Sequence, residues 1–259
     1  MYPEPPAKTG AAHAASETPG TAAAPASAAP TADAAPGPRQ LHREATTSEI
    51  LRLARAQLAE VGPAGLSLRK IAREMDLVSS AVYRYFPSRD ALLTRLILDG
   101  YSEYGAAVEL AEAPVSRDDH RARFEAAAAA LRDWALANPN SYALIYGSPV
   151  PGYHAPQDTI AAASRAGLVL MRILEDLRAA GHAFPAGGEV FAQGDAVAHL
   201  RDRLGPTLDA GHIALGIDVW SHLMGLISFE TFGQFTNMIT DPGRFYRAAV
   251  AESLTRFGL

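Results

Sequence analysis

Cysteine is absent from this sequence, which excludes disulfide bonds, thiolate metal sites and cysteine nucleophiles. Any metal ion would therefore need histidine and carboxylate ligands. No run of about 18 or more apolar residues occurs, so the sequence predicts a soluble chain with no membrane partner. The first residues also lack the basic start and the leucine-rich block that a secretory signal requires.

Familiar catalytic motifs are missing as well. The sequence has no G-x-S-x-G, no H-E-x-x-H and no glycine pattern of a dinucleotide-binding fold. Gly147 and Gly152 have the spacing of a phosphate loop, but Tyr153 and His154 follow where lysine and then serine or threonine are required. These absences predict that the protein is not an enzyme and uses no cofactor.

A histidine-containing segment near the C-terminus is the one candidate for a metal site. His212, His222 and Glu230 fall within one predicted helix, but their spacing does not give the close pairing of a helical metal site. We therefore predict no metal site. Inside an apolar helix, His222 and Glu230 are instead expected to be hydrogen-bonded partners in a pocket or an interface, because lone buried polar groups are costly.

Charge is distributed unevenly along the chain, whose formal net charge is −5. Residues 39–100 contain ten Lys and Arg against seven Asp and Glu, whereas residues 101–259 contain twelve against eighteen. A basic segment before an acidic one is typical of a DNA-reading head on an acidic body. The excess of three positive charges is modest and forms no polybasic patch.

Residues 1–40 consist mainly of Ala, Pro, Gly, Ser and Thr, with almost no large apolar side chain after Tyr2. Such a segment cannot bury enough surface to offset the entropy of ordering it. We expect a disordered tail. A DNA minor-groove arm is the alternative, with Lys8, Arg39 and Arg43 as its nearby cations.

The ordered chain is predicted to begin with an amphipathic helix over residues 46–61. Thr46, Thr47 or Ser48 would be its N-cap, and the Gly62-Pro63 pair would end it. Its hydroxyl-rich start could also hold a DNA phosphate. The apolar face consists of Ile50, Leu51, Ala54, Leu58 and Val61.

The most informative stretch is 67–93, SLRKIAREMDLVSSAVYRYFPSRDALL. After a good N-cap at Ser67, the spacing of Leu68, Ile71 and Met75 forms one apolar helix face. The pattern breaks at Asp76 for about one turn before a second apolar set begins. This arrangement predicts a helix-turn-helix, in which the second helix enters the major groove of DNA.

The exposed face of that second helix suits a DNA duplex. Ser79, Ser80 and Tyr83 carry hydroxyls that can donate to phosphate oxygens, and small side chains let a helix approach base edges. Arg84 can bind guanine with two hydrogen bonds. These residues are therefore candidate DNA contacts.

The run I-A-R-E…V-Y-R-Y-F-P-S-R-D-A-L-L resembles the DNA-binding domain of the TetR family of bacterial transcriptional regulators. The resemblance covers about residues 46–98. It implies that Arg69, Ser79, Ser80 and Tyr83 face base edges. It also implies phosphate contacts from Tyr85, which stands where the family often has His.

Other positions follow or depart from the family pattern. Arg89 replaces the usual Lys and keeps a phosphate donor, whereas Leu68 stands where a phosphate-binding Thr is common. Asp76 replaces a common Gly at the turn and tolerates left-handed backbone geometry. Thr46, Ser67 and Arg84 complete the set of DNA-binding candidates.

Residues 99–259 are predicted to form a helical ligand-binding and dimerisation domain. The Asn138–Pro156 stretch is expected to be two turns or a loop, and it resembles a recurrent feature in the ligand-binding domains of one TetR subgroup. No strand pattern appears. The helices are expected over residues 88–110, 117–137, 159–180, 190–204, 208–235 and 241–257.

Candidate ligand contacts in this domain are aromatic and polar residues that interrupt apolar faces, because ligand cavities are mostly apolar with a few polar groups. The same residues could equally be ordinary core residues. They are Trp134, Tyr142, Tyr146, Met171, Trp220, His222, Met224 and Phe229.

Together these features predict an all-α fold: a three-helix helix-turn-helix head over residues 41–98, followed by the helical body. The resemblance implies a cytoplasmic homodimeric regulator, a repressor that a small-molecule ligand releases from a palindromic double-stranded DNA operator. The alternative is a dimeric helical ligand-binding protein that does not bind DNA. A catalytic body is a third possibility with little in its favour.

Overall fold

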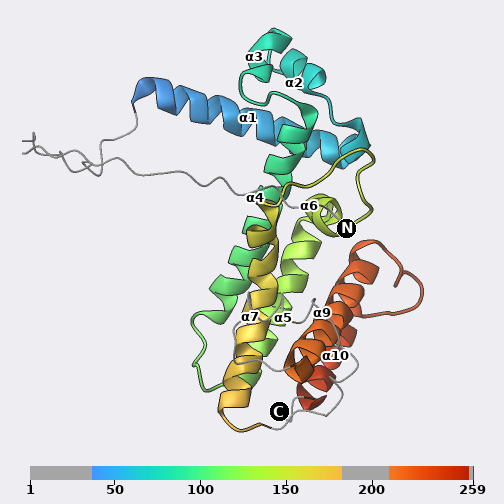
Figure 1. Cartoon of the computed structure of the whole chain (residues 1–259). Coiled ribbons are helices and arrows are strands. Elements are labelled where there is room, and N and C mark those ends of the chain that lie inside the picture. The colour runs from blue at the N-terminus through green and yellow to red at the C-terminus, as the bar shows by residue number, and fades with distance from the viewer. Residues whose placement is uncertain (1–36, 183–209, 257–258) are drawn as a thin grey trace, which may run out of the picture. The chain divides into compact units, whose positions relative to one another are not determined.

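The computed structural model describes residues 37–182, 210–256 and 259, and every regular element in these residues is a helix (Figure 1). The predicted all-α fold is therefore confirmed. Backbone contacts divide the chain into Met1–Leu41 and His42–Leu259. Of the first unit only residues 37–41 are described, and every other described residue belongs to the second unit. The predicted tail lies mostly outside the described residues.

Helix α1 (Pro38–Val61) starts earlier than the sequence predicted. Proline is favoured at a first helical position, and the residues after it are compatible with a helix. Thr46 and Thr47 therefore lie inside α1, where their hydroxyls donate to the carbonyl oxygens of His42 and Arg43 at 2.8 and 2.9 Å. The prediction that one of them caps the helix was wrong. The predicted end is confirmed, because Gly62 follows with a φ of 67°.

The helix-turn-helix is present as α2 (Leu68–Glu74) and α3 (Ser79–Tyr83), preceded by a short 3-10 helix, η1 (Pro63–Gly65). Asp76 takes the left-handed conformation that the turn needs, with a φ of 53°. These elements close over a core shared with α1 and the next helix. The core includes Ile50, Leu58, Ile71, Val82, Phe86, Leu92 and Leu93.

Helix α4 (Arg89–Glu112) connects the head to the body. Its first turns place Leu92 and Leu96 in the head core, whereas Tyr104 and Val108 are fully buried in a second, larger core. Ser88 caps the helix by accepting a hydrogen bond from the Ala91 amide at 3.0 Å. One continuous helix is therefore part of both cores.

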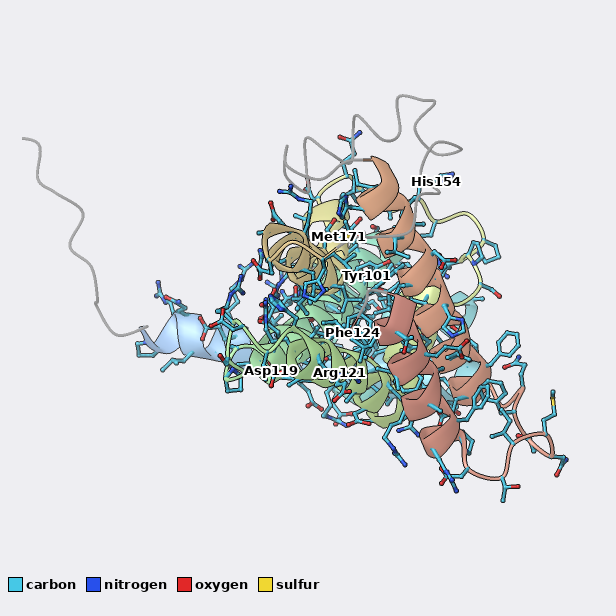
Figure 2. The ribbon with its side chains drawn as sticks, turned by 90° about the horizontal axis from the view of Figure 1, so that it is seen from below. Tyr101, Asp119, Arg121, Phe124, His154 and Met171 are labelled. Carbon is cyan, nitrogen blue, oxygen red and sulfur yellow. The ribbon has the colours of Figure 1, made fainter. Side chains whose placement is uncertain are left out.

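The body is built from α4, α5 (His120–Ala137), α6 (Pro139–Tyr146), α7 (Thr159–Ala179), α9 (Ala210–Thr231) and α10 (Pro242–Arg256). The α6 helix corrects the predicted loop over residues 138–156. The helix predicted over residues 190–204 lies outside the described residues. Figure 2 shows Tyr101, Phe124 and Met171 among these helices, with His154 at their outer edge.

The residues Gly211–Thr231 of α9 are long and apolar enough to cross a membrane by length and composition alone, which is weak evidence for a membrane span. A core helix of a soluble protein meets the same criteria. Ile213, Leu223 and Ile227 of this helix are fully buried in the body core. The Arg132 guanidinium on α5 also forms two hydrogen bonds, of 2.8 and 2.6 Å, with the Glu230 carboxylate.

Candidate DNA-binding surface and ligand cavity

The turn between α2 and α3 leaves one face of both helices in solvent. Arg69 on α2 and Ser79, Ser80, Tyr83 and Arg84 on or after α3 are all exposed. None of these side chains forms a hydrogen bond or ion pair with another described residue. Their polar groups are therefore free to contact an external partner, as a major-groove reader requires.

The remaining predicted DNA contacts interact with other residues of the head. Thr46 donates its hydroxyl within α1, and the Ser67 hydroxyl caps α2 by accepting from the Lys70 amide at 3.3 Å. The Arg43 guanidinium lies 5.7 Å from the centre of the Tyr85 ring. Arg89 donates to the Pro63 carbonyl oxygen at 2.7 Å. These four predicted contacts are thus anchored, and their contact with DNA stays a prediction.

Two further exposed residues on this surface were not among the candidates. Arg73 lies in the last turn of α2 and forms no ion pair with another described residue. Val78, which precedes α3, is 72% exposed. An apolar side chain at this place could contact a thymine methyl group. The sequence indicated that Val78 is exposed, because this residue lies outside the apolar face of both helices.

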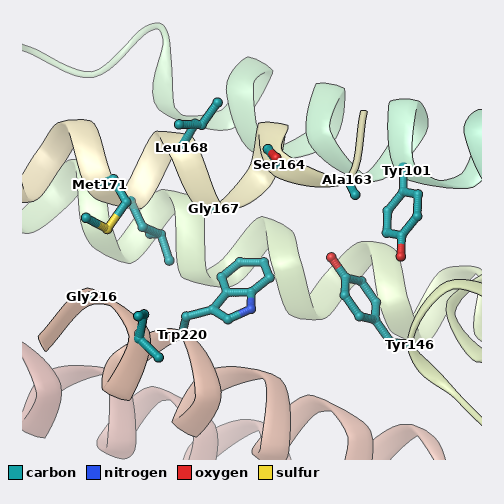
Figure 3. Close-up of a pocket in the computed structure, with 11 residues that line it drawn as sticks. Tyr101, Tyr146, Ala163, Ser164, Gly167, Leu168, Met171, Gly216 and Trp220 are labelled. Carbon is teal, nitrogen blue, oxygen red and sulfur yellow. The ribbon is translucent and has the colours of Figure 1, made fainter. Parts of the chain in front are cut away.

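A cavity of about 260 Å³ lies in the body between α4, α6, α7 and α9 (Figure 3). Tyr101 comes from α4, Tyr146 from α6 and Trp220 from α9, while Gly167 and Met171 come from α7. The Tyr101 and Tyr146 ring centroids are 5.8 Å apart, and those of Tyr146 and Trp220 are 6.4 Å apart. The lining is thus aromatic and apolar, as in many ligand sites.

The cavity brings together Tyr146, Met171 and Trp220 of the predicted ligand contacts. Trp134 instead packs against Tyr104, with ring centroids 5.0 Å apart. Tyr142 is fully buried, and its hydroxyl is 2.9 Å from that of Ser228.

The other predicted ligand contacts also lie away from this lining. Met224 is buried in the core, where its sulfur accepts a hydrogen bond from the Tyr104 hydroxyl at 3.5 Å. His222 is exposed on α9, so its predicted place in a pocket does not match the described cavity. Phe229 is 53% exposed and packs against Phe235.

Sequence reasoning missed Tyr101 and the glycines Gly167 and Gly216, which also line the cavity. A Cβ atom at Gly167 would meet nothing within 4 Å, whereas one at Gly216 would lie 2.4 Å from the Met171 sulfur. Gly167 therefore leaves open space in the cavity, whereas Gly216 allows the Met171 side chain to pack closely against α9. Burial raises the pKa of Tyr101 and, more strongly, of Tyr146, so both phenols stay protonated near neutral pH.

The cavity wall is connected to the head core through α6 and the segment after it. The Tyr101 hydroxyl donates to the Ile145 carbonyl oxygen at 3.0 Å. A few residues later, Val150 is 9% exposed and belongs to the head core, and the Tyr153 hydroxyl is 2.9 Å from the Thr94 hydroxyl on α4. A change at the cavity thus has a short packed route to the head.

The fold and the exposed α2–α3 face define a helix-turn-helix DNA-binding regulator. Residues 50–96 match the family model for bacterial regulatory proteins of the tetR family, and residues 124–253 match that for the tetracyclin repressor-like C-terminal domain. The HTH-type transcriptional regulators Rv1816 of Mycobacterium tuberculosis and Mb1846 of Mycobacterium bovis are each 39% identical over 221 residues, covering 82% of this chain and 92% of theirs. The chain belongs to the TetR family of bacterial transcriptional regulators.

Solved structures agree with this assignment. The regulatory protein SCO4313 is similar with a TM-score of 0.69 and 33% identity, over 85% of this chain and 100% of that one. A regulatory protein of the tetR family from Rhodococcus RHA1 shares the fold, with a TM-score of 0.57 and 19% identity over 82% of this chain and 96% of its own. Family membership makes the protein a transcriptional regulator and not an enzyme, as the sequence predicted.

Proposed function

We propose that this regulator is a cytoplasmic homodimeric repressor, which binds a palindromic DNA operator and is released when a small molecule enters the cavity of the body. The observation that carries this proposal is the path of α4. Its first residues are buried in the head core, and Tyr101, further along, forms part of the cavity wall. A ligand that favours one position of α4 would therefore also favour one position of the head.

Exposed apolar side chains support dimerisation through α9, α10 and the segment between them. Phe229 and Phe232 near the end of α9 are 53% and 41% exposed, Met238 is 77% exposed, and Phe245 on α10 is 43% exposed. Large exposed apolar groups on neighbouring helices are typical of protein interfaces. Two heads related by a two-fold axis would reach half-sites roughly 34–36 Å apart.

DNA reading is assigned to Arg69, Ser79, Ser80, Tyr83 and Arg84, because these side chains are exposed and unpaired within the described residues. Thr46, Ser67, Tyr85 and Arg89 are assigned to the flanking phosphates. In this arrangement the phosphate contacts position the head on the DNA, and the exposed side chains of the α2–α3 face contact the bases.

The alternative is a dimeric helical ligand-binding protein that does not bind DNA. The two functions differ in their response to salt, because phosphate contacts release counterions. For the repressor, affinity for duplex DNA should fall about tenfold or more between about 50 and about 200 mM salt. Light scattering on the same samples should give twice the chain mass. A folded dimer with no affinity for duplex DNA even at low salt would favour the alternative.

A further inference from the structure

None of the described residues that line the cavity carries a charged side chain. Within this described lining, the polar side-chain groups are the hydroxyls of Tyr101, Tyr146 and Ser164 and the indole N–H of Trp220. Arg165 lies on α7 next to this lining, but it forms hydrogen bonds of 3.0 and 2.6 Å with Glu109 on α4. An ion placed in the cavity would lose its hydration without gaining an opposite charge, which is costly. The site therefore suits an uncharged molecule.

Two of the polar groups that line the cavity already donate a hydrogen bond to a backbone carbonyl, and the other two do not. Tyr101 donates to the Ile145 carbonyl oxygen, and the Ser164 hydroxyl donates to the Ile160 carbonyl oxygen at 2.8 Å. The Tyr146 hydroxyl and the Trp220 indole N–H donate to no other described residue. Because Tyr146 has a raised pKa, its hydroxyl stays a donor. An occupant with a hydrogen-bond acceptor would satisfy these donors.

The aromatic lining favours an occupant that carries a ring system. The rings of Trp220, Tyr146 and Tyr101 follow one another along one side of the cavity, with Met171 beyond Trp220 (Figure 3). Aromatic rings and a thioether make favourable contacts with another ring system. Gly167, on the same helix as Met171, leaves open space where any other residue would place a side chain.

We propose that the cavity takes an uncharged, aromatic and mainly apolar small molecule that carries a carbonyl or ring-oxygen acceptor, and that Tyr146 and Trp220 recognise this acceptor. The proposal rests on the ligand-controlled function above and specifies the class of its ligand. Acetylnaphthalene has the required properties and serves as the probe. Ethylnaphthalene lacks only the acceptor, naphthoate is an anion and naphthylmethylammonium is a cation.

Binding is measured by calorimetry on the full-length protein without DNA, so that it does not depend on operator binding. We expect acetylnaphthalene to bind about tenfold more tightly than ethylnaphthalene, as two hydrogen bonds of modest net strength would give. The two charged probes should bind too weakly to measure. Equal or tighter binding of naphthoate or naphthylmethylammonium, or no binding of any probe by the folded protein, would overturn the proposal.

Two kinds of variant locate the binding. Tyr146→Phe should lower the affinity for acetylnaphthalene about threefold and leave ethylnaphthalene unchanged, because it removes one donor and keeps the ring. Trp220→Phe should lower the affinity for acetylnaphthalene more than that for ethylnaphthalene, because it removes a donor in addition to part of the ring area. An equal loss for both probes would show that these residues only shape the cavity. Gly167→Leu should lower the affinity for both probes tenfold or more, since its side chain enters the open space. Ala161→Leu, at an exposed position of the same helix, is the matched control and should change neither.

These outcomes are separable from those of the proposed repressor function. Probe binding without any affinity for DNA would contradict the repressor and leave the ligand class standing. DNA binding with no response to neutral probes would contradict the ligand class alone.

Discussion

The head and the body present their functional residues in opposite ways. In the head, Arg69, Tyr83 and Arg84 lie outside the core, and no other described residue pairs with them. In the body, the cavity is lined in part by Tyr146, Met171 and Trp220, which also pack against or belong to the body core. Substitutions in the head should therefore separate function from stability, whereas substitutions in the body should affect both.

The largest expected effect is on the stability of the body. Arg123 on α5 is fully buried and bonds to the Glu112 and Asp176 carboxylates at 2.5 and 2.7 Å. Arg123→Met would remove the closest cation of Glu112 and one of the two arginines bound to Asp176, and it should lower the free energy of unfolding by about 3 kcal/mol. Urea denaturation measures this loss.

The matched control for that change is Arg121→Met on the same helix. Arg121 is exposed and pairs with Glu125 one turn away at 3.3 Å. Its substitution should cost no more than about 0.5 kcal/mol. Similar losses in the two variants would show that burial does not set the energetics of the body.

The next effect is on DNA binding by the head. Tyr83→Ala and Arg69→Ala should each abolish specific operator recognition, with a loss of about 10- to 100-fold in affinity, as expected for the removal of a base contact. Stability should change by less than about 0.5 kcal/mol, because both residues are exposed. Fluorescence anisotropy on labelled operator DNA measures the affinity.

Arg95→Ala provides the control, since Arg95 is an exposed arginine on α4 that pairs with Asp99 at 2.8 Å. It should leave operator affinity unchanged. Full operator affinity in the Tyr83 or Arg69 variant would contradict the assignment of the α2–α3 face.

A smaller effect on stability is expected for the hydrogen bond between Tyr153 and Thr94, which connects the segment after α6 to α4. Tyr153→Phe removes the hydrogen bond to Thr94 and should cost about 1 kcal/mol of stability. It should also reduce the effect of a bound ligand on operator affinity about threefold, because one link between cavity and head is lost. Measuring operator affinity with and without the ligand gives this coupling.

A substitution at the next residue, His154, is the matched control for the Tyr153 variant. His154→Ala should change neither stability nor coupling, since His154 is exposed and makes no hydrogen bond with another described residue. A coupling equal to that of the wild type in the Tyr153 variant would mean that α4 alone transmits the change.

The smallest effect concerns the cavity itself. Gly167→Ala should raise the unfolding free energy by about 0.5–1 kcal/mol, because alanine is the better helix former and its methyl group meets no neighbour. The same methyl group should weaken the binding of acetylnaphthalene. Thermal unfolding and calorimetry would together show whether a change in the body can improve stability while impairing function.

The sequence predicted the head well because its signals are local. The spacing of Leu68 and Ile71 marks a helix face, and both are buried as predicted. Asp76 marks a turn by its position and takes the expected left-handed backbone. The start of α1 was placed too late because the hydroxyls of Thr46 and Thr47 can either cap a helix or bond within one.

The body was harder to predict because its site joins residues distant in the sequence. Trp134 and Trp220 look alike in their local patterns, yet only Trp220 lines the cavity. Gly167 contributes because it has no side chain, and the periodicity of apolar residues in the sequence does not reveal such a position. The α6 helix was missed although Pro139 at its first turn and the spacing of Tyr142 and Tyr146 fit a short helix.

The most direct test of the DNA-reading head is the selection of bound sequences from a random duplex pool by the purified protein. We predict enrichment of a palindromic sequence with half-sites about one DNA turn apart, as a two-fold dimer with one α3 in each major groove requires. A folded dimer that enriches no sequence at low salt would contradict this account and favour the ligand-binding alternative.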